Sequence, residues 1–244
     1  MNVSLIDYTG MGAHPHHAVD LLIFTKNTRL EMKPGLMNEI RAWTWKRKMK
    51  ELAYMANTIP SSWEFVHYTF LIENVTRAFT HQLVRTRTAS FAQQTMRVLN
   101  VEGWTYSTGP TVIDDQSNNA IYQNAMKDVS GAYDDLIKHG AAIEDARGIL
   151  PTNIHTNIVM SANLRTITEM IQKRSSPRVQ GEYRDFISMI KTCITEVHNW
   201  AQIFFNQDFD KAADDLYQNI ANASGLNTDE RTAMVKLVDK MRAS

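Results

Sequence analysis

Apolar side chains recur along the chain with two different spacings, and the shorter spacing predicts strands. Val66, Tyr68, Phe70 and Ile72 alternate with neighbours that face the other way, and residues 154–160 repeat this period of two. Alternation of this kind places one apolar face of a strand against a core. The predicted strands cover residues 3–8, 66–72, 90–98 and 154–160.

Apolar positions three and four residues apart predict helices over most of the remaining chain. The clearest pattern runs over residues 186–204, where Phe186, Ile190, Val197 and Phe204 belong to one apolar stripe. The other predicted helices cover residues 35–57, 75–84, 118–139, 142–150, 164–173, 211–223 and 228–241. Several strands among many helices predict a helix-rich α+β fold. We expect a single domain over residues 1–244 that ends in a helical extension at 210–244.

The composition is that of a globular protein without disulfides or membrane segments. Of the 244 residues, 43% are hydrophobic and 21% are charged, which is ordinary for a soluble domain. No stretch approaches about eighteen apolar residues, and the first residues lack the basic and apolar regions of a signal peptide. The single cysteine excludes an internal disulfide and fits a reducing compartment. We therefore expect a cytoplasmic protein that does not bind a membrane.

The overall charge argues against nucleic acid as a general partner. The 26 basic residues are balanced by 26 acidic ones, whereas non-specific nucleic-acid binding needs positive charge to neutralise phosphates. The basic run Lys46-Arg47-Lys48-x-Lys50 is interpreted as the solvated face of the helix over residues 35–57. No nucleic-acid polymer is therefore expected as a partner.

Two other features invite a chemical interpretation that the sequence does not favour. His14, His16 and His17 lie close together, as metal ligands can, but no cysteine or acid lies beside them. An exposed loop is therefore favoured there, and no metal is expected. Cys193 lies within the apolar stripe of the predicted 186–204 helix, which favours a buried structural thiol over a reactive one.

An unusual cluster of arginines lies between Glu73 and Glu102, a stretch that contains no acid and no lysine. The planar guanidinium group can bind a phosphate or carboxylate through two parallel hydrogen bonds, which lysine cannot do. The arginines are Arg77, Arg85, Arg87 and Arg97, and the neutral polar residues among them are Gln82, Thr86, Ser90, Gln93, Gln94 and Thr95. A solvated basic helix face is the more common form of such a cluster. The absence of lysine and acid favours instead a pocket for a small anion that carries a polar ring.

The chain contains none of the common nucleophile or phosphate-binding motifs. Gly-x-Ser-x-Gly, Cys-x-x-Cys, His-Glu-x-x-His and the phosphate-binding glycine loop are all absent. A polar pocket without a protein nucleophile must act through positioning, electrostatics and a cofactor that brings its own reactivity.

Two blocks of the chain resemble the signature of the flavin-dependent thymidylate synthases. The family motif reads Arg-His-Arg, then Ser and Arg, and is matched here by Arg85-Thr86-Arg87, Thr95 and Arg97. The matching residues of this first block are 70–73, 76–78 and 81–97. The second block is Glu144-Asp145-Ala146-Arg147-x-Ile149-Leu150-Pro151, Asn163-x-Arg165, Arg174 and Gln180. With their flanks, the two blocks cover roughly residues 60–190.

The resemblance implies a fold, a reaction and an assembly. The family fold has a small, mostly antiparallel sheet, and its homotetramer shares each active site among subunits. The implied reaction transfers a one-carbon unit from methylenetetrahydrofolate to C5 of dUMP and gives dTMP. In the family, FAD is the cofactor and NADPH is the reductant. This chemistry agrees with the lack of a protein nucleophile, because the flavin supplies the reducing hydride.

The resemblance also assigns residues to the two ligands. The dUMP-binding positions are Gln82, Arg85, Gln93, Gln94, Thr95, Arg97, Arg147 and Arg174. The FAD-binding positions are Arg85, Thr86, Arg87, Thr88, Gln94, Asn163, Arg165 and Glu169. Arg174 matches the catalytic arginine that stabilises the ionised pyrimidine, and a fixed cation beside a ring amide does lower the energy of the anionic form.

The sequence departs from the family pattern mainly at flavin-side and folate-side positions. The departures are Thr86 and Ile59 for histidine, Glu169 for asparagine, Arg178 for histidine and Val98 for tyrosine. These changes keep two alternatives open. One is a relative that leaves a hydroxymethyl group on a pyrimidine deoxynucleotide. The other is an inactive homologue that binds a nucleotide or RNA.

Overall fold

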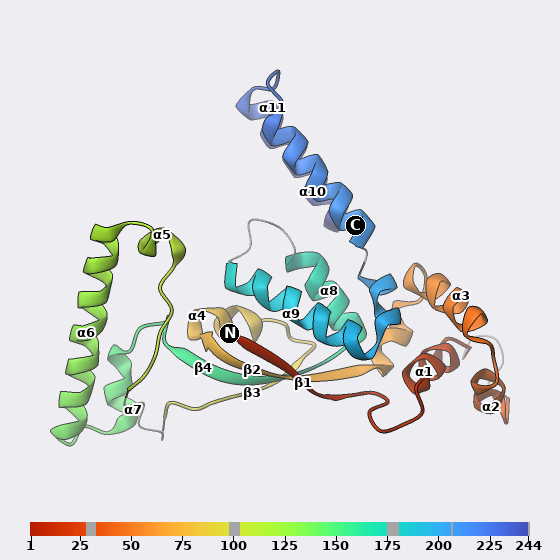
Figure 1. Cartoon of the computed structure of the whole chain (residues 1–244), viewed down its shortest axis with the longest axis horizontal. Coiled ribbons are helices and arrows are strands. Elements are labelled where there is room, and N and C mark those ends of the chain that lie inside the picture. Colours follow the sequence, from red (N-terminus) through yellow and green to blue (C-terminus); the bar gives the residue numbers. More distant parts are fainter. Residues whose placement is uncertain (28–32, 98–102, 175–180, 206, 244) are drawn as a thin grey trace. The chain divides into compact units, whose positions relative to one another are not determined.

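The computed structural model describes residues 1–27, 33–97, 103–174, 181–205 and 207–243. Its sheet is antiparallel and contains four strands, β1 (Asn2–Tyr8), β2 (His67–Thr76), β3 (Ser90–Gln93) and β4 (His155–Asn163). The spatial order is β1-β2-β4-β3 (Figure 1). Every second residue of β4 is buried, as the period of two predicted.

Along the sequence, helices lie between the strands and after the last one, and they make up most of the chain. The helix-rich α+β prediction is therefore confirmed. The α-helices are α1 (His17–Lys26), α2 (Leu36–Arg41), α3 (Trp45–Ala56), α4 (Arg77–Leu83), α5 (Pro110–Ile113), α6 (Gln116–Lys138), α7 (Ile143–Ala146), α8 (Leu164–Arg174), α9 (Gly181–Val197), α10 (Gln207–Asn222) and α11 (Thr228–Ala243). The 3-10 helices are η2 (Pro60–Phe65), η3 (Arg147–Ile149) and η4 (Asn199–Phe204). The C-terminal extension is helical as predicted, because α10 and α11 form it.

Several predicted elements differ in extent from the observed ones. The strand expected over residues 66–72 continues to Thr76, so α4 begins at Arg77 rather than at residue 75. The helix expected over residues 35–57 is two helices, because Thr44 starts α3 by accepting the Arg47 N–H on its side-chain oxygen. The helix expected over residues 186–204 ends at Val197, and the chain continues as η4. The strand expected over residues 90–98 ends at Gln93, and Val98 lies outside the described residues.

The chain divides into two compact units. The first contains Met1–Asn2 and Leu71–Met160, and the second contains Val3–Phe70 and Ser161–Ser244. The core of the first unit includes Phe79, Tyr133 and Ile158, and that of the second includes Leu22 and Phe186, all of them fully buried. The single domain expected over residues 1–244 stays a prediction.

None of the helices in the described ranges combines the length and the apolar character that are needed to cross a bilayer.

Candidate functional site

Gln93 and Gln94, two of the predicted nucleotide-binding residues, lie where β3 ends in the first unit. The Gln94 N–H donates to the Asn157 carbonyl oxygen at 2.9 Å, and the Asn157 side-chain amide donates to Gln94 Oε1 at 3.0 Å. Gln93 Nε2 donates to Thr80 Oγ1 at 3.0 Å. The side chains of both glutamines are therefore positioned by hydrogen bonds to β4 and α4.

Two predicted arginines meet at Glu144 of α7. Arg97 Nε donates to Glu144 Oε2 at 3.1 Å, and Arg147 Nε donates to the Glu144 carbonyl oxygen at 3.1 Å. Thr95 Oγ1 accepts the Arg97 N–H at 3.1 Å, which holds the bend that leads to Arg97. The Arg97 and Glu144 side chains are 69% and 54% exposed, so an incoming anion can reach this guanidinium group.

Arg77 is a third arginine of this unit and belongs to the arginine cluster between Glu73 and Glu102, where it had no predicted role. It opens α4, where Thr76 Oγ1 accepts the Phe79 N–H at 3.0 Å. Its Nη1 atom is buried and has no hydrogen-bond partner in the part of the chain that the structure describes. Burial, followed by the positive charge of Arg147, lowers the pKa of Arg77. A buried guanidinium nitrogen beside a second cation suits an anionic ligand.

The predicted flavin-side motif, residues 85–88, forms the turn that follows α4. The Thr86 N–H donates to the Leu83 carbonyl oxygen at 3.0 Å, so the turn continues the end of the helix. Arg85 and Arg87 are exposed, and neither side chain makes a hydrogen bond or ion pair with the described residues. Thr88 is exposed as well. Gln82, the remaining predicted residue of this stretch, lies half-buried on α4.

Asn163 and Arg165, predicted to bind the flavin nucleotide, lie in the second unit at the start of α8. Asn163 Oδ1 accepts the Thr166 N–H at 2.9 Å and so caps the helix. This cap occupies the side-chain oxygen and leaves the amide NH₂ group as the donor that a ligand could use.

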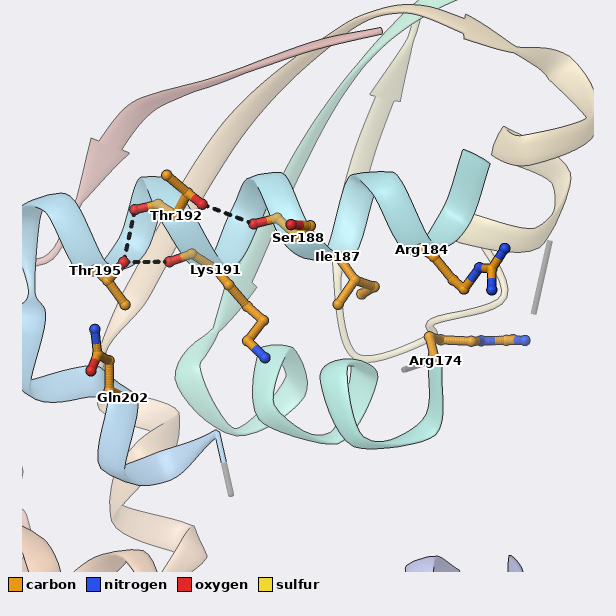
Figure 2. Close-up of a pocket in the computed structure, with 8 residues that line it drawn as sticks. All are labelled: Arg174, Arg184, Ile187, Ser188, Lys191, Thr192, Thr195 and Gln202. Carbon is orange, nitrogen blue, oxygen red and sulfur yellow. Dashed lines mark hydrogen bonds between the residues drawn. The ribbon is translucent and has the colours of Figure 1, made fainter. Parts of the chain in front are cut away.

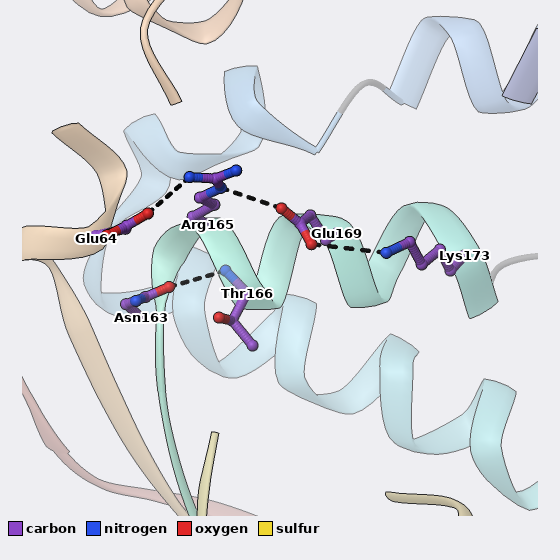
Figure 3. A network of polar contacts seen from close by, with 6 residues as sticks. All are labelled: Glu64, Asn163, Arg165, Thr166, Glu169 and Lys173. Atoms are coloured by element: carbon purple, nitrogen blue, oxygen red, sulfur yellow. Dashed lines mark hydrogen bonds and ion pairs between the residues drawn. The ribbon is translucent and has the colours of Figure 1, made fainter. Parts of the chain in front are cut away.

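Carboxylates bind the Arg165 guanidinium group on two sides (Figure 3). Arg165 Nη1 lies 2.7 Å from Glu64 Oε1, and Arg165 Nε lies 3.1 Å from Glu169 Oε1. Lys173 Nζ follows at 3.6 Å from Glu169 Oε2. The hydrogen bonds to Glu64 and Glu169 raise the pKa of Arg165. This network balances two cations with two anions and reduces the attraction of Arg165 for a phosphate.

Arg174, the predicted catalytic residue, ends α8 in the second unit. Its guanidinium carbon lies over the Tyr183 ring, 5.0 Å from the ring centre, at a distance where the cation and the aromatic face attract. Arg174 also lines a polar groove beside α9 (Figure 2). Among the residues predicted to bind dUMP, Arg85, Arg97 and Arg147 belong to the first unit and Arg174 to the second. Their joint contact with one nucleotide stays a prediction.

The histidines and the cysteine differ in detail from what the sequence suggested, because an acid lies against His14 and Cys193 is not fully buried. His14 Nε2 lies 2.9 Å from Asp20 Oδ2, and the described residues contain no group of three or more histidines, cysteines and acids placed to hold a metal. Cys193 is half-buried rather than fully buried, and its thiol donates to the Val3 carbonyl oxygen at 3.6 Å. Burial, followed by the charge of Glu196, raises the pKa of this thiol, which agrees with an unreactive cysteine.

One predicted position is corrected by the structure and others lie outside it. Lys48, interpreted from the sequence as part of a solvated face, is buried and pairs with Asp20 at 2.6 Å. The predicted departures at Val98 and Arg178, and the family match at Gln180, fall outside the described residues. Ile59 is described and precedes η2.

The family is decided by a comparison with protein-family sequence models. Residues 6–201 match the model described as thymidylate synthase complementing protein. The chain belongs to this family. The membership confirms the predicted family resemblance, and the matched range contains the residues of both blocks.

Individual relatives of this thymidylate synthase complementing protein family carry the name flavin-dependent thymidylate synthase. The relative from Nitratidesulfovibrio vulgaris is 35% identical over 147 residues, which cover 55% of this chain and 60% of the relative. The relative from Clostridium tetani is 32% identical over 150 residues, with the same two coverages. That from Pyrococcus abyssi is 36% identical over 126 residues, or 50% of this chain and 52% of the relative. The chain thus spans between about half and 60% of the length of these relatives.

A solved structure shows the same fold. The crystal structure of thymidylate synthase X from Helicobacter pylori, determined with FAD and dUMP, has a TM-score of 0.64 against this chain. The likeness covers 84% of this chain and 97% of the other, at 18% sequence identity. The fold expected from the family resemblance is therefore confirmed.

Proposed function

We propose that this chain is a flavin-dependent thymidylate synthase. It transfers a one-carbon unit from methylenetetrahydrofolate to C5 of dUMP and gives dTMP, with FAD as cofactor and NADPH as reductant. Family membership over residues 6–201 and the names of the relatives support this reaction. The observation that carries the proposal is the gathering of Arg97 and Arg147 at Glu144, with Arg77 beside Arg147.

The arginines of the first unit are proposed to hold the nucleotide monophosphate. Arg77 supplies a buried nitrogen without a protein partner, and Arg97 supplies an exposed fork. Guanidinium groups bind phosphate oxygens in pairs of parallel hydrogen bonds. The other residues proposed to contact dUMP in this unit are Gln82, Arg85, Gln93, Gln94, Thr95 and Arg147.

Arg174 is proposed to act on the pyrimidine ring. Its cation lowers the energy of the ring when a proton leaves the ring nitrogen, because an opposite charge nearby favours the ionised form. The Arg174 guanidinium carbon lies 5.0 Å from the centre of the Tyr183 ring. This contact restricts the Arg174 side chain before the substrate binds, so less conformational entropy is lost on binding. Preorganised charges of this kind carry much of the rate enhancement in many enzymes.

FAD, when bound, supplies the reducing hydride in this proposal. The residues fit a flavin dinucleotide in part. Arg85 and Arg87 are exposed and have no ionic partner among the described residues. Their guanidinium groups can therefore bind a pyrophosphate. Arg165 fits less well because Glu64 and Glu169 already bind it. The other residues proposed to contact FAD are Thr86, Thr88, Gln94 and Asn163.

A homotetramer is proposed as the active assembly, in which subunits share the sites. Of the 23 residues of α6, only Tyr133 is buried. Ile121 and Leu136 on this helix are 69% and 39% exposed. Exposed apolar side chains on a helix of this length are suited to burial against another copy of the chain.

The test is product analysis with the purified full chain. The protein is incubated with dUMP, methylenetetrahydrofolate, NADPH and FAD, and mass spectrometry then measures the mass of the nucleotide product. Formation of dTMP that requires all four supports the proposal. A product heavier by one oxygen, or a protein that shows no flavin spectrum after FAD is added, overturns it. No comparison favours either a hydroxymethyl-transferring or an inactive relative.

A further inference from the structure

A polar groove runs along one face of α9, and all of its lining residues belong to the second unit. Its volume is about 380 Å³, within the range of pockets that hold small molecules. The lining includes three cationic side chains and no carboxylate. The proposed reaction uses only Arg174 from this groove, so the rest of the lining has no assigned role.

One end of the groove is cationic (Figure 2). Arg174 and Arg184 extend in the same direction there, and Lys191 lies between them and the other end. Arg184 and Lys191 are two helical turns apart on α9 and therefore share a face. Lys191 is half-buried, and its ammonium group makes no hydrogen bond or ion pair within the described ranges.

The opposite end of the groove is neutral and offers hydrogen-bond acceptors. Thr195 Oγ1 donates its hydrogen to the Lys191 carbonyl oxygen at 2.9 Å, and Thr192 Oγ1 donates to the Ser188 carbonyl oxygen at 3.2 Å. Both hydroxyl hydrogens are therefore engaged with the helix backbone, and the oxygens keep lone pairs that can accept a hydrogen bond. Gln202 lies at the same end and can accept or donate.

We propose that this groove binds an elongated anionic small molecule that also carries amide N–H groups, and that this ligand is the glutamyl tail of a folate. Each glutamyl residue brings a carboxylate for Arg184 and Lys191, the two cationic lining residues without a role in the proposed reaction, and an amide N–H for the threonine oxygens. Naming the folate rests on the proposed function, in which methylenetetrahydrofolate is the one-carbon donor. Lys191 is then a specificity residue that raises the affinity for a longer, more negatively charged tail.

The test measures equilibrium binding to the full chain and needs no turnover. Pteroylmonoglutamate and pteroyltriglutamate are titrated against the wild type and Lys191→Gln, with folding checked by circular dichroism. The wild type should prefer the triglutamate, and Lys191→Gln should reduce this preference by about tenfold, the effect of one charge-assisted hydrogen bond. The dissociation constant of dUMP should stay unchanged. Lys46→Gln, which removes the same charge from an exposed position on α3, should keep the preference.

Several outcomes would overturn the assignment. One is a wild type that binds both folates equally, and another is a Lys191→Gln variant that keeps the full preference. A third titration uses 2′-phosphoadenosine, which carries the phosphate that distinguishes NADPH from NADH. If Lys191→Gln weakens this probe and spares the folate preference, the groove serves the reductant instead.

A second variant and a second readout keep the two proposals separable. Thr195→Val keeps the shape of the side chain and removes the acceptor, so it should also weaken pteroyltriglutamate. Thymidylate formation tests the proposed function alone. Lys191-dependent binding of pteroyltriglutamate in a protein that makes no dTMP would overturn the reaction and leave the groove assigned.

Discussion

His198 shows how a single buried side chain makes stability depend on pH. Its ring lies among Tyr8, Tyr68 and Trp200, and the Tyr68 hydroxyl is 2.9 Å from its Nδ1 atom. Burial lowers the pKa of His198 to about 4, below the value of about 6.5 expected for the unfolded chain. The folded state therefore favours the neutral ring and loses stability when a proton must be accepted.

We expect the free energy of unfolding to fall as pH decreases from about 6.5 to 4, by up to about 3 kcal/mol from this residue. The stabilisation is fully present above the unfolded pKa, because both states are then neutral. Urea unfolding at pH 7.5 and pH 5 measures the difference. His198→Gln should show a smaller decrease than the wild type, and an equal decrease would assign the pH dependence to other groups.

Lys48 and Asp20 form a buried ion pair in the second unit. Their side chains are 2% and 1% exposed, and Lys48 Nζ also donates to the Arg41 carbonyl oxygen at 3.2 Å. Lys48→Met should destabilise the fold by about 3–5 kcal/mol, because Asp20 then remains buried without its main partner. The double variant with Asp20→Asn should recover much of this loss. Chemical unfolding compares both with Lys46→Met, an exposed control that we expect to change stability by about 0.5 kcal/mol or less.

Arg174→Ala tests the catalytic proposal at its central residue. Turnover should fall by about two to four orders of magnitude, as is typical when a preorganised charge is removed. The melting temperature should change little, since Arg174 is only half-buried at the end of α8. Arg174→Lys keeps the charge and should retain part of the rate. Near-normal turnover of the alanine variant would remove Arg174 from the mechanism.

Among the elements, α8 carries a network that should weaken flavin binding. Arg165 is bound by Glu64 at 2.7 Å and by Glu169 at 3.1 Å. Glu169→Asn removes one of these acids and should tighten FAD binding by up to about fivefold, the scale of an exposed ion pair. Fluorescence titration of FAD measures the change, with Asp229→Asn on α11 as a control that alters charge far along the sequence. Equal or weaker FAD binding by Glu169→Asn would show that Arg165 does not contact the cofactor.

Local signals in the sequence predicted most elements, and packing decided the rest. The period of two in β4 and the stripe of α9 are strong patterns, and both elements form. Thr44 caps α3 with a side chain that could equally have lain inside a longer helix. The residues of α1 are mostly apolar all round, so no amphipathic stripe marked it as a helix.

At the scale of the whole molecule, the exposed face of α6 bears on assembly. If a second copy covers it, Ile121→Asp should convert the proposed tetramer into smaller species and abolish the proposed thymidylate formation, because a charge is then placed in an apolar contact. Light scattering after size exclusion measures the mass of the particle. Lys127→Asp, at an exposed polar position of the same helix, is the matched control. An Ile121→Asp protein with unchanged mass would exclude this face as the contact.

The candidate site was predictable from the sequence only where its residues are consecutive. Gln93 and Gln94 belong to the matching block at residues 81–97, and hydrogen bonds to α4 and β4 hold their side chains. The meeting of Arg97 and Arg147 at Glu144 depends on tertiary structure, as does the buried position of Arg77. Chain periodicity carries no information about such encounters.

Because of the ion pair between Arg97 and Glu144, the proposed binding of a nucleotide would replace one anionic partner of Arg97 by another. Its two side chains are 69% and 54% exposed, so the pair is open to competition from any stronger anion. A phosphate that takes Arg97 displaces a carboxylate rather than solvent and counterions alone. Added salt weakens both the departing and the arriving partner. Affinity for the monophosphate should consequently vary less with ionic strength than the number of arginines at the site suggests.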